Sequence, residues 1–100
     1  MIAVYVTFAN KKEAEEICGV LVDEKLIACA NIFPCTSIHI WKDVKRKGEE
    51  SIAIIKASEK NWGKIEKKIK ELHSYETPCI VAYKSFKASK EYAEWVEGKK

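Results

Sequence analysis

The stretch that decides the fold reads IAVYVTFANKKEAEEICGVL and covers residues 2–21. Its opening segment, Ile2–Phe8, is a nearly continuous apolar run rich in β-branched side chains, which predicts a central strand. Asn10 follows, and Glu13 stands three residues later, which is the spacing of a helix N-cap and its capping-box partner. A helix is therefore predicted over residues 11–25. Its buried face carries Ala14, Ile17, Cys18 and Leu21.

The next part of the chain predicts a long antiparallel hairpin. Residues 28–40 have an extended pattern that is bent at Pro34. Proline cannot donate a ladder hydrogen bond, so Pro34 belongs at a sheet edge or a bulge. The polar residues 42–50 predict a turn, and the apolar residues 52–57 predict the returning strand.

The remaining residues predict a helix, a strand and a short final helix. Ser58 is expected to cap the helix. The buried stripe of that helix is Trp62, Ile65, Ile69 and Leu72. Thr77 and Pro78 break the chain before a strand over residues 79–86, and Ser89 opens the last helix. That helix carries Tyr92, Trp95 and Val96 on one side.

This order predicts one α+β domain over residues 1–100. Its architecture is ferredoxin-like, βαββαβ: a four-stranded antiparallel sheet with two helices on one face, a long hairpin between the second and third strands, and a C-terminal helix.

Composition excludes several classes of protein. With 47% hydrophobic and 33% charged residues the chain is globular, and no apolar run approaches the roughly 20 residues that span a bilayer. The net charge is only +3 and Arg46 is the sole arginine, which argues against a dedicated nucleic-acid binder. We see no basic leader at the start and no CxxC pair among the four cysteines, so free thiols in the cytoplasm are expected.

Three segments carry a likeness to a known family. They read KLIACANI (residues 25–32), TSIHIW (residues 36–41) and ELHSYETP (residues 71–78), and Tyr92 and Trp95 complete the pattern in the tail. Together they resemble the CutA family of divalent-cation tolerance proteins. The resemblance implies a homotrimer whose hairpins cross between subunits, a link to divalent metals with copper bound by some members, and a likeness to the nitrogen-regulatory PII proteins.

The resemblance also implies candidate site residues. His73 and Glu76 are the candidate ligands for Cu²⁺ or another divalent cation, since imidazole suits Cu(II) and Zn(II). Cys29, Tyr75 and Trp41 are the candidate lining of a ligand-binding cleft between subunits. Four of them have a plainer interpretation. His73 can be a hydrogen-bonded histidine at a helix end, Glu76 a loop carboxylate, Cys29 a structural thiol, and Trp41 an interface aromatic.

The sequence departs from the family pattern at several positions. Val6 and Leu72 stand where some members have a cysteine and a second histidine proposed as copper ligands. A lone imidazole binds metal weakly, so any metal site must be completed by other groups or by another subunit. His39 replaces a usual aromatic and is interpreted as a packing residue, while residues 42–48 form an unusually basic hairpin tip, interpreted as a solvated turn.

Three other functions occur with, or are compatible with, this architecture. Acylphosphatase shares the architecture but needs an arginine after the first strand, where this chain has Ala-Asn-Lys-Lys at residues 9–12. RNA-recognition domains stack bases on aromatics of a central strand, and residues 52–57 contain none. We therefore expect neither an enzyme nor a nucleic-acid binder. A PII-like signalling or structural interaction trimer with no specific metal role stays open.

Overall fold

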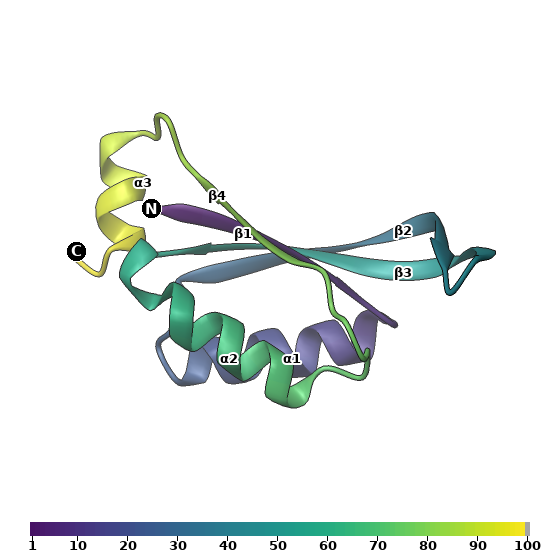
Figure 1. Ribbon diagram of the computed structural model, residues 1–100. Coiled ribbons are helices and arrows are strands. Elements are labelled where there is room, and N and C mark those ends of the chain that lie inside the picture. The colour runs from purple at the N-terminus through teal and green to yellow at the C-terminus, as the bar shows by residue number, and fades with distance from the viewer. Residues whose placement is uncertain (100) are drawn as a thin grey trace.

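The computed structural model describes residues 1–99, which form one antiparallel sheet with the strand order β2-β3-β1-β4. This order and the chain connectivity confirm the ferredoxin-like α+β prediction. The elements are β1 (Ile2–Phe8), α1 (Lys11–Asp23), β2 (Cys29–Trp41), β3 (Val44–Ala57), a 3₁₀ helix (Glu59–Asn61), α2 (Trp62–Leu72), β4 (Ile80–Lys84) and α3 (Lys90–Val96). Helices α1 and α2 lie side by side against one face of the sheet (Figure 1).

The core lies between these two helices and the sheet. Alternate residues of β1 from Ile2 to Phe8 are buried, because a strand turns successive side chains to opposite faces. The predicted face of α1 is buried as expected, and α2 contributes Ile65 and Ile69. The prediction that Leu72 completes the buried stripe of α2 is wrong: Leu72 is the last residue of the helix and is 45% exposed.

The hairpin differs most from the prediction. The prediction of a turn over residues 42–50 is wrong, because β3 already begins at Val44. Only Lys42 and Asp43 form the turn, and they have left-handed φ angles of 52° and 64°, respectively. Antiparallel pairing of β2 and β3 runs without interruption from Trp41 opposite Val44, next to the turn, to Cys29 opposite Lys56. The polar residues of β3 are solvent-exposed on both faces here, so they carry no apolar alternation that would reveal a strand.

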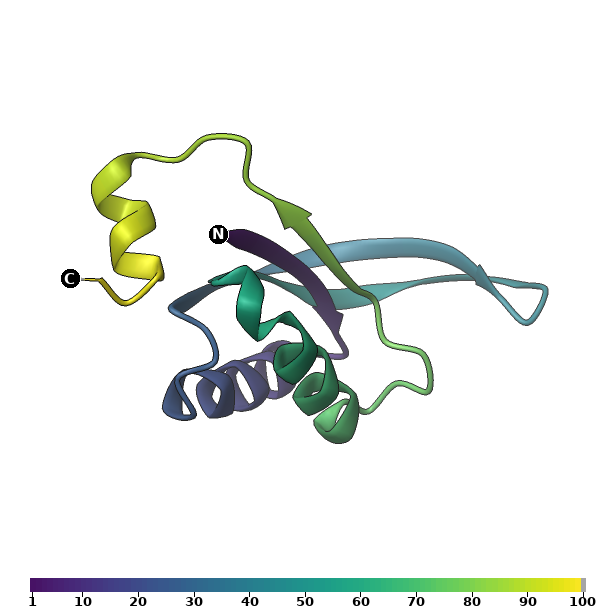
Figure 2. The same ribbon diagram turned by 60° about the vertical axis from the view of Figure 1, so that its left-hand side comes forward.

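The outer part of this hairpin, residues 36–49, is called the arm. Figures 1 and 2 show it projecting past the ends of α1 and α2, so neither of its faces is covered by a helix. The described molecule measures 47 × 25 × 21 Å as a result. Pro34 lies in β2 just before the arm. Because proline has no backbone N–H to donate, it is expected at a sheet edge or a bulge, and β2 is an edge strand.

Smaller differences concern caps and element ends. Asn10 caps α1 as predicted, with its side chain accepting the Glu13 N–H at 2.8 Å. Ser58 instead precedes the 3₁₀ helix, and its side chain makes no capping bond. Ser89 is the N-cap residue of α3, as predicted, but its side chain makes no capping bond either. The fourth strand is shorter than residues 79–86. Among residues 1–99, no helix has both the length and the apolar character needed to cross a bilayer.

The sheet face opposite α1 and α2 is called the open face. Apolar side chains lie on it from the edge strands, including Phe33 of β2 and Val81 and Tyr83 of β4, and these side chains are exposed. Helix α3 sits at the end of the sheet away from the arm, near the N-terminus (Figure 1). The two faces of the sheet therefore differ: one is packed, and the other presents apolar surface and a cavity.

Candidate functional site

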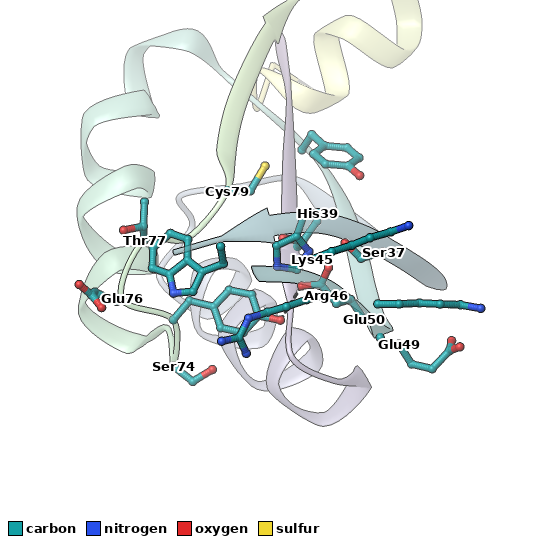
Figure 3. Close-up of a pocket in the computed structure, with 16 residues that line it drawn as sticks. Ser37, His39, Lys45, Arg46, Glu49, Glu50, Ser74, Glu76, Thr77 and Cys79 are labelled. Atoms are coloured by element: carbon teal, nitrogen blue, oxygen red, sulfur yellow. Dashed lines mark hydrogen bonds between the residues drawn. The ribbon is translucent and has the colours of Figure 1, made fainter. Parts of the chain in front are cut away.

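An open cavity of about 990 Å³ lies on the open face, where the arm meets the segment after α2. Its lining comes from β1, from both strands of the arm and from residues 74–77 and 79 (Figure 3). Segments far apart in the sequence meet here because β3 is paired with β1, while the chain after α2 returns to place β4 on the other side of β1. Sheet order therefore assembles the cavity.

His73 lies beside this cavity, at the C-terminal cap of α2. Its Nδ1 accepts the Tyr75 N–H at 3.1 Å, so Nε2 carries the ring proton and donates to the Thr7 carbonyl at 2.8 Å. The ring is stacked on Phe8, with 5.0 Å between centroids. Both nitrogens are therefore used within the subunit, and a cation at Nδ1 would have to displace the Tyr75 amide.

Tyr75 joins the segment after α2 to the base of the arm. Its hydroxyl donates a hydrogen bond to the Glu50 carboxylate at 2.5 Å. Partial burial, and next the hydrogen bond to Glu50, raise the pKa of Tyr75 above its usual value. The phenol therefore keeps its proton and donates it to the hydrogen bond with the Glu50 carboxylate.

Glu13 holds the same segment from the helix side. Its carboxylate accepts the Ala9 N–H at 3.0 Å and the Ser74 N–H at 2.9 Å. Partial burial alone would raise the pKa of Glu13, but the hydrogen bonds from Ser74 and Ala9 together outweigh it, so the pKa is lower than usual. The predicted capping-box residue thus also ties the start of α1 to the loop beside the cavity.

Glu13→Gln is expected to lower the free energy of unfolding by about 1 kcal/mol at pH 7, because charge-assisted hydrogen bonds are lost. A lowered folded-state pKa gives stability that is present above the unfolded glutamate pKa of about 4.3 and is lost as the pH falls through the folded value. The difference in the free energy of unfolding between wild type and Glu13→Gln should therefore shrink as the pH falls below about 4.3. Urea unfolding at pH 7, 5 and 3 measures it. Glu16→Gln, on the exposed side of the same helix, is the control, and equal losses at pH 7 would contradict the assignment.

The structure brings some of the predicted site residues together and leaves one apart. Tyr75, Trp41 and Glu76 all line the cavity. The exposed Glu76 carboxylate lies 3.9 Å from the Lys42 ammonium of the arm's turn. Cys29 lies at the opposite end of the open face and does not line the cavity.

At that opposite end, the Cys29 Sγ is 3.3 Å from the Tyr92 hydroxyl of α3. This hydrogen bond and then burial raise the pKa of Tyr92 to about 12. Within residues 1–99, no three histidine, cysteine or acidic side chains lie close enough together to hold a metal ion. Sequence reasoning missed Glu50 and the second role of Glu13, since their partners are 25 and 61 residues away.

Comparisons with known proteins agree with this architecture. The family described as "CutA1 divalent ion tolerance protein" matches residues 2–99. A divalent-cation tolerance protein CutA from Thermotoga maritima is 38% identical over 96 residues, which is 96% of this chain and 95% of that protein.

Solved structures match equally well. The periplasmic divalent cation tolerance protein CutA from Archaeoglobus fulgidus has a TM-score of 0.95 at 33% identity, covering 99% of this chain and 98% of that one. The PII-like protein CutA from Nostoc sp. PCC 7120, in apo form, has a TM-score of 0.92 at 29% identity, covering 99% and 96%. The likeness seen in three short segments thus extends over nearly the whole chain, which belongs to the CutA1 divalent ion tolerance family.

Proposed function

We propose that this protein forms a cytoplasmic homotrimer that serves tolerance of, or response to, divalent cations, and that it acts by binding and not by catalysis. The observation that carries the proposal is the exposed apolar surface of the arm, where Ile38 and Ile40 are 62% and 72% exposed. An arm without a covering layer needs a partner, because contiguous apolar surface of this kind is rare on a monomer. The divalent-cation role follows from family membership.

A closed ring of subunits meets this need. The sheet has unpaired edges at β2 and β4, and an exposed edge invites further pairing. An arm that reaches onto the next subunit makes a heterologous contact, and such contacts stop growing only when the rotation closes. The homotrimer implied by the family resemblance is a closed ring of this kind.

The cation is proposed to bind where subunits meet, with His73 and Glu76 as the contributions of this chain and Cu²⁺ as the candidate ion. One subunit alone does not bring three ligands together within the described residues, so the neighbour must complete the site. A cation on His73 Nδ1 would displace the Tyr75 N–H and free the segment that lines the cavity. Cation binding would then be coupled to a conformational response.

His73→Asn is expected to weaken Cu²⁺ binding at least about tenfold, because the imidazole of the proposed metal site is lost. The substitution should leave the trimer intact. Calorimetric titration with CuCl₂ measures the affinity, and light scattering checks the assembly. Glu16→Gln is the control, since it removes an exposed carboxylate of α1 that lies outside the arm and the cavity. Equal affinity in wild type and His73→Asn would refute the metal role of His73.

A second candidate function is a PII-like signalling or structural interaction trimer with no specific metal role. Its support is the pair of hydrogen bonds that already occupy both ring nitrogens of His73. The same copper titration separates the two candidates. The cytoplasmic location is supported by the four cysteines, which are free thiols in this structure, and cell fractionation tests it.

A further inference from the structure

The charged groups around the cavity are unequally partnered. Two acidic lining residues accept hydrogen bonds from neutral hydroxyls, Glu50 from Tyr75 at 2.5 Å and Glu49 from Thr36 at 3.3 Å. The Glu76 carboxylate forms an exposed ion pair with the Lys42 ammonium at 3.9 Å. The basic lining residues are Lys45, Arg46 and Lys47. Among residues 1–99, none of these three has a carboxylate within 4 Å. Strand alternation puts Arg46 on the face of the arm that carries His39, whereas Lys45 and Lys47 lie on the other face, so Arg46 is the basic side chain on the cavity side.

Arg46 is placed to bring one positive charge to the cavity. It pairs with His39 across the two strands of the arm, and both side chains line the cavity. Gly48, opposite Ser37, leaves space beside them, since a Cβ there would meet no atom within 4 Å. In Figure 3 the Arg46 side chain extends toward the segment of Ser74, whereas Glu49 points away from it.

Aromatic rings flank the same space. Trp41 comes from the end of β2, Tyr75 from the segment after α2, and His39 from the arm. The Tyr75 hydroxyl is bonded to Glu50, and its ring already packs against the His73 ring with 4.7 Å between centroids, so Trp41 is the better candidate to stack with a ligand. Indole and phenol rings stack with planar ligands, and guanidinium binds phosphate and carboxylate oxygens in a bidentate manner.

We propose that this cavity binds a small aromatic anion, a planar ring that carries a phosphate or a carboxylate. Arg46 holds the anionic group, and Trp41 contacts the ring. The inference deepens the proposed function, because it names the ligand class for the cleft beside His73. The volume of about 990 Å³ has room for a bicyclic ring with its substituents. The basic arm, which reads as a solvated turn from its sequence, is thereby given a role.

Calorimetry on the full chain in its solution assembly tests the proposal with AMP, adenosine and inorganic phosphate. AMP should bind, and adenosine and phosphate should each bind at least about tenfold more weakly, because each supplies only half of the recognised chemistry. Indole-3-acetate tests whether a carboxylate replaces the phosphate. Arg46→Gln should weaken AMP binding at least about tenfold. Trp41→Leu should weaken both AMP and adenosine binding.

Lys64→Gln is the matched control, because it also removes one exposed positive charge but lies on α2 away from the cavity. It should change AMP affinity by less than about twofold. Equal losses in Arg46→Gln and Lys64→Gln would overturn the proposal, as would equal binding of AMP and adenosine. A short single-stranded oligonucleotide that binds more tightly than AMP and displaces it would also overturn it, in favour of a nucleic-acid surface.

Light scattering on the same samples separates this inference from the proposed function. A monomer that binds AMP with loss in Arg46→Gln would refute the trimer and support the ligand site. A trimer that binds Cu²⁺ through His73 but not AMP would support the proposed function and refute the ligand site.

Discussion

Phe8→Ala is expected to lower the free energy of unfolding by about 3–5 kcal/mol, the usual cost of removing a large aromatic side chain from a packed core. Phe8 is 0% exposed at the end of β1, and its ring is stacked on His73 at 5.0 Å between centroids. The substitution therefore leaves a void and also removes the support of the His73 ring. Urea unfolding followed by circular dichroism measures the loss, at a fixed chain concentration because assembly adds to apparent stability.

Phe86→Ala is the matched control for this prediction. The Phe86 side chain is 93% exposed, so its removal should change the free energy of unfolding by no more than about 0.5 kcal/mol. A loss below about 1 kcal/mol for Phe8→Ala would show that the site collapses to fill the void. Similar losses in both variants would contradict the placement of Phe8 in the core.

Replacement of Ile38 and Ile40 together by glutamate is expected to convert the proposed trimer into a monomer. Both residues belong to the arm and have exposed side chains. Figure 2 shows the arm projecting beyond α1 and α2. Burying two carboxylates in an apolar contact costs far more than such a contact contributes. Light scattering should show the mass fall from three times to once the 11.4 kDa of the chain.

Val22→Glu is the control for assembly. Val22 is an exposed apolar residue of α1, remote in sequence and structure from the arm. Its substitution should leave the mass unchanged, and the circular dichroism spectrum should show that both variants fold. A double variant that keeps the mass of wild type would refute the arm as the subunit contact.

Local rules explain which parts of the fold were predictable. The β1 run and the α1 helix follow from periodicity and from the Asn10 cap, whose bonds lie within a few residues. The arm was not predictable in the same way. Its turn, Lys42–Asp43, lacks the Asn-Gly or Asp-Gly pair typical of a two-residue hairpin, and Gly48 lies within a strand and not in the turn.

The sequence by itself determined the order of the main helices and strands, the packed face of α1, and the family, because these depend on neighbours along the chain. Only the tertiary structure decided which hydrogen bonds the His73 ring makes, because its Nε2 donates to the Thr7 carbonyl, 66 residues away. It also separated Cys29 from the cavity and placed Arg46 in its lining. The physical reason is the strand order β2-β3-β1-β4, since pairing across the sheet sets contacts that no local pattern encodes.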